Sequence, residues 1–203
     1  LGNWILVLIA MAVVLSYNAA GNALNDYMDY ESDAVNRPDR PISSGKVNRR
    51  AALIMSIVLF GIGTVCAFSL LFEAKVVAIG IALPLLVLYS LRLKKLPLIG
   101  NVTVSLLLGL TFIFCGYVFD GFQHILIPAA LAFGLTLVRE LVKDISDMEG
   151  DKNALMQTFP IMAGLRNAVS LSVFLAMVTG LGALLPYWFG IYGNIYLIIL
   201  VFG

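Results

Sequence analysis

The sequence predicts an all-α protein, a bundle of transmembrane helices forming one domain over residues 1–203, and two features predict this fold. The first is composition: 61% of the 203 residues are hydrophobic and only 12% are charged, whereas soluble domains average about 25% charged residues. The second is that the apolar runs are long enough for helical spans of about 20 residues, unlike the short alternating strands of a membrane barrel. The net charge of +1 gives no indication of a nucleic-acid partner.

The apolar segments predict about seven to eight helices in this chain, and seven spans can be placed in order. The first follows directly from the start of the chain, and the second begins after Arg50. The third is short and contains Pro84, so we expect it to be kinked or extended into its flanks. Short turns separate the fourth span from the fifth and the sixth from the seventh, which indicates antiparallel neighbours. The predicted spans are about 3–24, 51–72, 76–91, 99–118, 123–142, 161–186 and 191–203. Because the chain starts and stops within apolar runs, we expect it to be truncated at both ends.

The charged residues are concentrated in the connections between alternate spans. Ten of the 25 lie between Asp26 and Arg50, and eight lie between Arg139 and Lys152. If every predicted span crosses the membrane, twelve of the thirteen basic residues lie on one side and Lys75 alone lies on the other. Basic residues gather on the cytoplasmic side of membrane proteins. The sequence therefore predicts a multi-pass protein of the cell membrane with its charged loops in the cytoplasm.

Two acidic triplets share one spacing: an aspartate, a second three residues later, and a third four residues after that. They are Asp26, Asp29 and Asp33 in NALNDYMDYESD, and Asp144, Asp147 and Asp151 in ELVKDISDMEGD. Each has a polar residue four positions before its first aspartate, Asn22 or Glu140. On a continuous helix these four positions fall within roughly a 60° arc. We therefore expect each set to form one acidic stripe.

Three functions are consistent with such acidic stripes. They could be solvated helix ends, or an ion or proton pathway as in a transporter, which favours isolated acids deep within spans. They could also form a magnesium–diphosphate site, because Mg2+ takes one or two carboxylates and completes its shell with phosphate oxygens and water. The repeated spacing at span ends, with many cations nearby, favours the third. Metals together with Arg or Lys stabilise a departing diphosphate, and the apolar bundle suits a polyprenyl tail.

Four segments resemble, in order, the UbiA superfamily of intramembrane prenyltransferases. NDYMDYESD matches the first aspartate motif of that family, RPDRPISSGKV its tail, YSLRLKKLPLIGN the loop after the fourth span, and KDISDMEGDK the second aspartate motif. Within the superfamily, RELVKDISDMEGDK is most similar to the archaeal digeranylgeranylglyceryl phosphate synthases. The resemblance implies about nine helices in a full protein and Mg2+ as cofactor. It also implies transfer of a geranylgeranyl group from its diphosphate to a lipophilic acceptor, at a site surrounded by membrane lipids. The acceptor it implies is the hydroxyl of geranylgeranylglyceryl phosphate.

The motifs also imply roles for individual residues. Lys143 is expected to act with the aspartates in catalysis, and no histidine is placed to act as a general base. Arg40 is expected either to contact the diphosphate or to neutralise the first stripe, whereas Arg49 is expected to anchor the membrane surface. The acceptor's own phosphate needs a cation, for which Arg139 and Lys46 are candidates. The predicted metal ligands are Asp26, Asp29, Asp33, Asp144, Asp147 and Asp151. The predicted diphosphate-binding residues are Asn22, Asn25, Arg37, Arg92, Lys94 and Arg139.

Three alternatives stay open or are disfavoured at this point. Other branches of the superfamily use aromatic or quinone acceptors and share parts of the pattern. A cation or lipid-phosphate transporter could be built on a similar bundle. A CDP-alcohol phosphotransferase is disfavoured, because its single contiguous motif is missing and two distant motifs stand in its place. The sequence gives no oligomeric state and no donor chain length.

Overall fold

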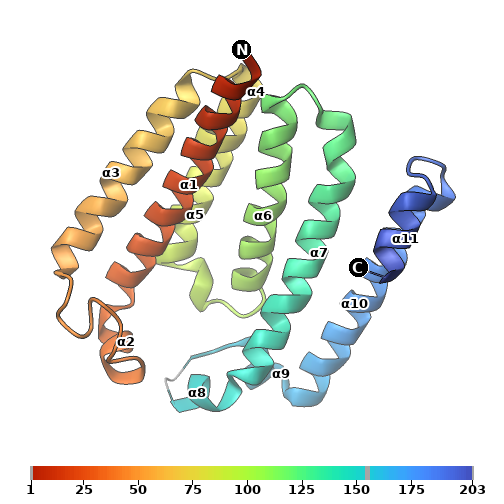
Figure 1. The fold of residues 1–203 in the computed structure, drawn as a ribbon. Helices are drawn as coiled ribbons and strands as arrows, with labels where there is room; N and C mark the ends of the chain where they lie inside the picture. The colour runs from red at the N-terminus through yellow and green to blue at the C-terminus, as the bar shows by residue number, and fades with distance from the viewer. Residues whose placement is uncertain (1, 154–155, 203) are drawn as a thin grey trace.

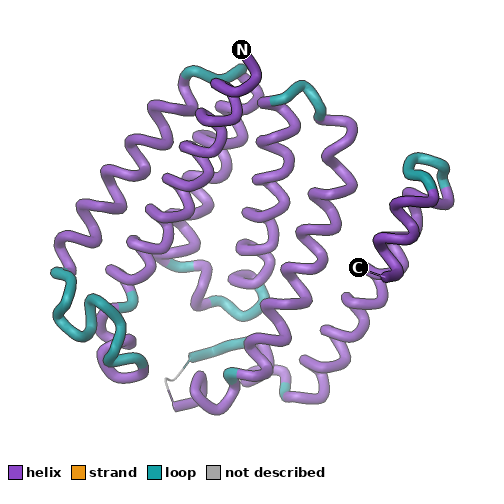
Figure 2. Tube along the Cα trace, viewed as in Figure 1, coloured by secondary structure: helices purple, strands orange, loops and turns teal. Residues whose placement is uncertain are grey.

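A computed structural model describes residues 2–153 and 156–202, and these residues form helices and loops without any strand (Figures 1 and 2). The all-α membrane bundle predicted from the sequence is confirmed. Within the described residues six helical runs are long and apolar enough to cross a membrane. They are α1 (Gly2–Met28), α3 (Arg49–Phe68), the continuous run α4 (Phe72–Lys75), η1 (Val76–Ala82) and α5 (Leu83–Leu91), then α6 (Ile99–Val118), α7 (Phe122–Ser146) and α10 (Leu165–Trp188).

Five shorter helices complete the described part of the chain. They are α2 (Tyr30–Asn36), η2 (Leu93–Lys95), α8 (Met148–Asn153), α9 (Phe159–Ala163) and α11 (Asn194–Phe202). Helix α11 corresponds to the seventh predicted span and packs against α10. The expected extension of the third span is confirmed, because its helical run covers Phe72–Leu91 and includes a π-helical segment directly before α5. The predicted end of the second span at 72 was wrong: α3 ends at Phe68, where the Ser69 hydroxyl donates to the Cys66 carbonyl at 2.7 Å.

Close contacts between neighbouring helices hold the bundle together. Helix α1 packs mainly against α3, α6 against α7, and α7 also against α10. Gly63 of α3 allows the first of these contacts, since a Cβ there would lie 2.6 Å from the Tyr17 ring. Gly134 of α7 does the same for α10, where a Cβ would lie 2.5 Å from the Thr179 hydroxyl oxygen. Small residues that let helices approach in this way are a general device of membrane bundles.

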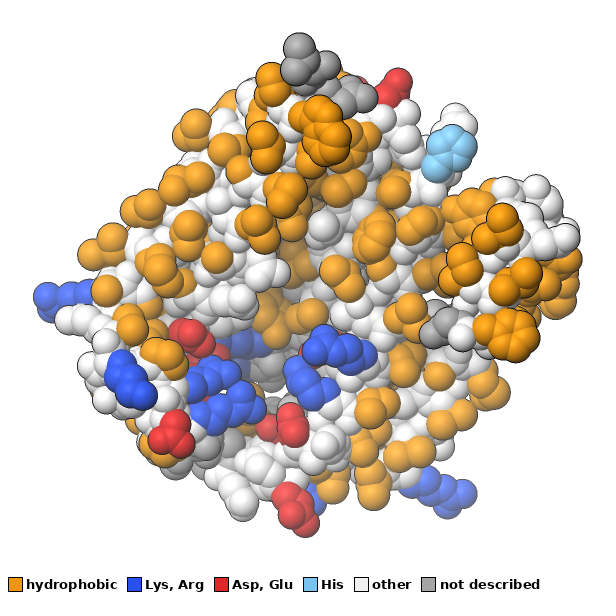
Figure 3. Space-filling view, viewed as in Figure 1, with side chains coloured by type: hydrophobic (Ala, Val, Ile, Leu, Met, Phe, Trp, Pro, Cys, Tyr) orange, Lys and Arg blue, Asp and Glu red, His pale blue; other side chains and the backbone are white. Residues whose placement is uncertain are grey.

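The charged connections gather at one end of the bundle. Helices α2 and α8 and the chain between α5 and α6 lie at the lower end in Figure 1, whereas α4, which ends at Lys75, lies at the upper end. In the space-filling view of the same side, most Lys, Arg, Asp and Glu side chains surround a hollow in the lower half (Figure 3). The loops predicted to share one membrane face therefore do share one end of the molecule.

Candidate active site

Both aspartate segments have the same backbone arrangement at the ends of long helices. The first aspartate lies in or next to the last turn of α1 or α7, the second lies at the break after that helix, and the third lies in the short helix that follows. The breaks match closely: Asp29 has φ −89° and ψ 3°, and Asp147 has φ −89° and ψ 2°. The expectation of one uninterrupted helix through each triplet was therefore wrong. Each set of carboxylates bends around a helix end at its middle member.

The carboxylates of the first segment contact cations from later parts of the chain. Arg40 Nη1 lies 2.7 Å from Asp33 Oδ2 and 3.2 Å from Asp26 Oδ1, so one guanidinium bridges two acids. Lys94 Nζ lies 2.6 Å from Asp29 Oδ1, and this lysine side chain is only 12% exposed. Each of the three acids thus contacts a cation in this conformation, and the two cations offset most of the negative charge. Of the two roles expected for Arg40, the structure supports neutralisation of the acids.

Local structure explains how these two cations reach α1. Arg40 lies on a folded loop in which the amide of Ser44 donates to the Arg40 carbonyl and Ile42 is buried. Lys94 lies on η2, which rests on the start of α6, where a Cβ at Gly100 would lie 3.2 Å from Lys94 Cα. Leu98, directly before α6, has φ 62°, a backbone region that costs energy for a residue with a side chain. The bend at Leu98 and the lack of a side chain at Gly100 place Lys94 beside Asp29.

A further cation fixes the end of α1 itself. Arg49, at the start of α3, donates from Nε to the Tyr27 carbonyl at 3.2 Å. Its guanidinium also lies over two aromatic rings, 4.7 Å from the centre of Tyr27 and 5.1 Å from the centre of Tyr30. Such stacking suits the planar guanidinium better than an ammonium group. Arg49 therefore ties α3 to the segment that carries Asp26 and Asp29.

The second segment has different partners. The Asn101 side chain donates to Asp144 Oδ2 at 2.8 Å, so a neutral amide and not a cation contacts this acid. Lys143 Nζ instead lies 2.6 Å from Glu140 Oε2, and Arg139 Nη1 lies 3.3 Å from Glu140 Oε1. Among the described residues, no ion pair joins the aspartates of this segment to a cation.

The third aspartate of this segment is affected by burial. Burial raises the pKa of the Asp151 carboxyl group, and the neighbouring Asp147 carboxylate adds to the rise. Thr158, Lys143 and Arg37 oppose it. Arg37, which follows the first segment in the chain, is thus one of the charges that act on the second segment.

Tyr89 gives a second link between the two aspartate segments. The carboxylates of Glu140, Asp29 and Asp144 all act electrostatically on its hydroxyl group. Tyr89 lies near the end of α5, which packs against both α1 and α6. The fold therefore brings residues of both segments around one side chain at the charged end of the bundle.

The donor set is compatible with Mg2+ that is bound together with a phosphate ligand. Among the described residues, no three acidic, histidine or cysteine side chains converge closely enough to hold a metal ion by themselves. Mg2+ commonly uses one or two carboxylates and fills its other positions with water and phosphate oxygens. The buried Asn25 Oδ1 accepts no hydrogen bond from the described part of the chain, so a neutral oxygen is also available beside Asp26. The site thus offers hard oxygen ligands that need a phosphate to complete a metal shell.

The remaining predicted residues lie at the same end with different contacts. Asn22 is exposed and donates to the Asn18 side chain at 3.1 Å, and Arg92 is exposed at the end of α5. Their roles, and those of the other predicted site residues, stay predictions. Sequence reasoning gave no role to Asn101, and it placed Glu140 in the second acidic stripe without predicting its cation partners. Both are polar residues within long apolar helices. This contrast in polarity is the feature of the sequence that could have identified them as candidate site residues.

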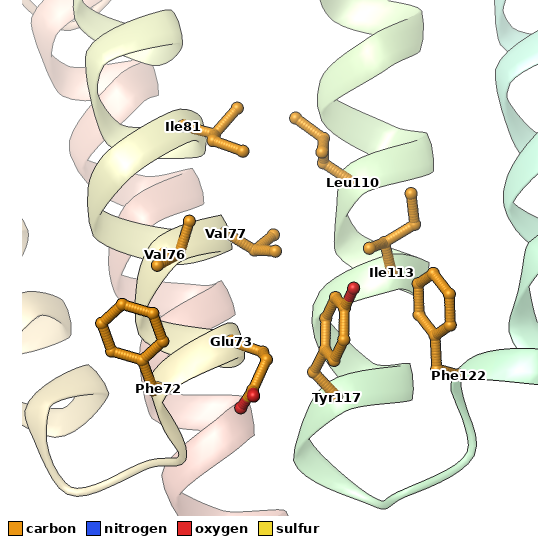
Figure 4. A pocket seen from close by; sticks show the side chains of 9 residues that line it. All are labelled: Phe72, Glu73, Val76, Val77, Ile81, Leu110, Ile113, Tyr117 and Phe122. Atoms are coloured by element: carbon orange, nitrogen blue, oxygen red, sulfur yellow. The ribbon is translucent and has the colours of Figure 1, made fainter.

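An apolar pocket of about 440 Å³ lies at the other end of the bundle (Figure 4). The run from α4 to η1 faces α6 across it, and Glu73 is the one acidic residue among its lining side chains. The lining residues are Phe72, Glu73, Val76, Val77, Ile81, Leu110, Ile113, Tyr117 and Phe122. It is separate from the aspartate segments and has the apolar walls that an aliphatic chain prefers.

Comparison with known proteins agrees with the motifs. The model of the UbiA prenyltransferase family matches residues 1–203. The digeranylgeranylglyceryl phosphate synthase of Methanothermobacter thermautotrophicus is 39% identical over 195 residues, which cover 96% of this chain and 69% of that protein. The enzyme of the same name from Methanospirillum hungatei is 43% identical over 202 residues, covering 94% and 71%.

Solved structures show the same fold. A structure of digeranylgeranylglyceryl phosphate synthase in membranes superposes with a TM-score of 0.81 at 33% identity and covers 96% of this chain and 69% of that one. A UbiA homologue from Archaeoglobus fulgidus bound to DMAPP and Mg2+ superposes with a TM-score of 0.83 at 18% identity, covering 97% and 71%. The resemblance inferred from the four motifs is confirmed, and with it the prediction of a multi-pass membrane enzyme that transfers prenyl groups. The chain belongs to the UbiA prenyltransferase family.

Proposed function

We propose that the protein transfers a geranylgeranyl group from geranylgeranyl diphosphate to the free hydroxyl of geranylgeranylglyceryl phosphate, with Mg2+ as cofactor. The observation that carries this proposal is the pair of equally bent aspartate segments at one end of an apolar bundle. Lys94 contacts Asp29 of the first segment, Asn101 contacts Asp144 of the second, and Lys94 packs against the start of the helix that carries Asn101. Relatives that are 37–43% identical bear the name digeranylgeranylglyceryl phosphate synthase, which supports this acceptor.

The proposed ligands of the metal–diphosphate are the six aspartates, with Asn22 and Asn25 adding neutral oxygens or orienting them. When bound, Mg2+ would neutralise the diphosphate and make it a better leaving group. Lys94 and Lys143 now pair with Asp29 and Glu140. Once Asp29 binds metal, the Lys94 ammonium group is free to meet the negative charge that develops on the diphosphate, and Lys143, Arg92 and Arg37 are the other cations proposed to meet it.

The transfer exchanges one carbon–oxygen bond for another. The bond between the allylic carbon and the diphosphate breaks, the acceptor hydroxyl forms an ether bond to that carbon, and its proton goes to the departing diphosphate. The bundle holds the prenyl tail away from water, which protects the cationic carbon from hydrolysis. The apolar pocket near Val77 and Leu110 extends the apolar surface available to such a tail.

The proposal also covers the orientation of the protein in the membrane and its domain organisation. The charged end, with the aspartate segments, faces the cytoplasm according to the distribution of basic residues. Residues 1–203 act as one prenyltransferase domain. Since both substrates are lipids, they would reach the site from within the membrane.

The direct test is an activity screen of the purified protein in liposomes with labelled geranylgeranyl diphosphate and Mg2+. The acceptors are geranylgeranylglyceryl phosphate, 4-hydroxybenzoate and a quinone precursor. We expect an ether product and released diphosphate with the first acceptor only, and no product after chelation of Mg2+. Product from an aromatic acceptor alone would replace the proposed acceptor. Movement of unchanged substrate across the membrane, without product, would point to a transporter instead.

A further inference from the structure

We propose that Arg139 binds the phosphate group of the acceptor lipid, at a subsite separate from the one that holds the donor diphosphate. This inference rests on the proposed function, because only a phosphorylated acceptor needs a second anion site. It decides between the two roles that the sequence suggested for Arg139, which were contact with the donor diphosphate and contact with the acceptor phosphate.

The contacts of the cations at the charged end separate Arg139 from the cations that hold the first aspartate segment. Arg40 bridges two aspartates, Lys94 pairs with Asp29, and Arg49 is stacked over two tyrosine rings. Each of these cations contacts a segment that carries the predicted metal ligands. Arg139 contacts none of those ligands among the described residues, and its side chain is 76% exposed.

Glu140 holds Arg139 and Lys143 as a pair with excess positive charge. One carboxylate, 9% exposed, contacts both cations at 3.3 Å and 2.6 Å. A buried carboxylate needs such partners, so the pair is held in place without any ligand. Two cations that share one acid leave a net charge of +1 at the surface. The arrangement therefore offers an anion site that does not depend on displacing an aspartate.

The position of Arg139 matches the short reach of the acceptor. In a glyceryl phosphate, the free hydroxyl lies on the carbon next to the one that carries the phosphate, so the two groups are only about 5 Å apart by bond lengths. Arg139 lies five residues before Asp144 on the same helix, which is roughly 7.5 Å of rise. Five residues also turn the helix by about 140°, so the long Arg139 side chain, and not the axial spacing alone, has to bring a bound phosphate toward the predicted metal site. The helix itself fixes this spacing, because both residues belong to α7.

The chemistry of the side chain agrees with this assignment. A guanidinium presents parallel N–H donors that match two oxygens of a phosphate group. Exposed arginines at a membrane boundary hold their charged heads at the level of lipid headgroups. Lys143, one turn further on, shares Glu140 with Arg139 and lies next to Asp144 in the chain, between the two proposed anion sites.

The test compares a phosphorylated acceptor with the same lipid without its phosphate. We would measure KM and kcat for geranylgeranylglyceryl phosphate and for geranylgeranylglycerol, at saturating geranylgeranyl diphosphate, with wild type, Arg139→Gln and Arg139→Lys. Arg166→Gln is the matched control, since Arg166 is an exposed arginine at the same end of the bundle. The KM for the donor is measured in parallel.

Arg139→Gln should raise the KM for the phosphorylated acceptor at least about tenfold, since a charged hydrogen bond is lost. It should leave kcat/KM for the unphosphorylated lipid and the KM for the donor within about twofold of the wild-type values. Arg139→Lys should have a KM for the phosphorylated acceptor between those of wild type and Arg139→Gln. Equal losses with both acceptors, or a raised donor KM, would assign Arg139 to the diphosphate. Unchanged kinetic constants with both acceptors would show that Arg139 is a surface residue without a role in binding the acceptor. Wild type that uses neither acceptor would overturn the proposed function itself, and this inference with it.

Discussion

The two aspartate segments have nearly the same backbone, yet they differ in what neutralises their charge. In the first, Arg40 and Lys94 contact all three carboxylates. In the second, the contact to Asp144 comes from the neutral Asn101, while the nearby cations pair with Glu140. The first segment is therefore stabilised by ion pairs that a metal must compete with. The second retains carboxylates that raise each other's affinity for cations. This difference predicts that the two segments contribute equally to catalysis but unequally to stability.

The largest expected effect is on transfer itself. Asp26→Ala and Asp144→Ala should each lower kcat/KM at least about a thousandfold, since each removes a ligand of the metal that carries the diphosphate charge. Labelled geranylgeranyl transfer measures this loss. Asp120→Asn is the control, because Asp120 is an exposed acid in the turn between α6 and α7, at the opposite end of the bundle. Retained Mg2+-dependent activity in either aspartate variant would remove that segment from the metal site.

The next effect concerns the hydrogen bond that is particular to the second segment. Asn101→Ala should lower kcat/KM about 10- to 100-fold, the range typical of residues that orient metal ligands. It should raise the Mg2+ concentration needed for half-maximal activity. Thr103→Val is the matched control, because this buried threonine bonds to a carbonyl of its own helix segment. Equal activity in the two variants would mean that Asn101 does not orient Asp144.

Stability should separate the two segments. Asp33→Ala leaves Arg40 with one of its two acids, whereas Asp151→Ala removes a carboxylate that no cation contacts among the described residues. We expect the melting temperature of the metal-free protein to fall by a few degrees for Asp33→Ala and less for Asp151→Ala. Thermal unfolding in detergent measures both. A larger fall for Asp151→Ala would contradict the difference in ion pairing.

The smallest effect is expected at the contact between α3 and the first segment. Arg49→Lys keeps the charge but loses the stacked guanidinium and the bond from Nε. We expect kcat to fall by a few-fold and the Mg2+ requirement to rise, because Asp26 and Asp29 are less well positioned. Arg50→Lys is the matched control on the next residue. If both variants behave alike, Arg49 has only the role of a surface charge.

The sequence was sufficient for the fold and for placing the two aspartate segments at one end of the bundle. Apolar runs and a one-sided distribution of basic residues predicted the bundle, and the spacing of the six aspartates pointed to two related segments. The break at Asp29 and Asp147 could not be predicted, since a regular spacing looks the same in a straight helix and in a bent one. The partners of Arg40 and Asn101 depend on the loop fold and on the approach of α6 to α7, which are set by tertiary packing. Arg49 was expected to be a surface charge, because its stacking on Tyr27 depends on how α3 meets α1.

The central claim is that both segments hold one metal–diphosphate, and a double-mutant cycle tests it most directly. Affinity for inorganic diphosphate in the presence of Mn2+ would be measured by titration for wild type, Asp26→Asn, Asp144→Asn and the double variant. Residues that act as a unit give non-additive losses, whereas independent sites give losses whose free energies add. We predict that the double variant loses little more affinity than the weaker-binding single variant. Free-energy losses that add fully would contradict a shared site.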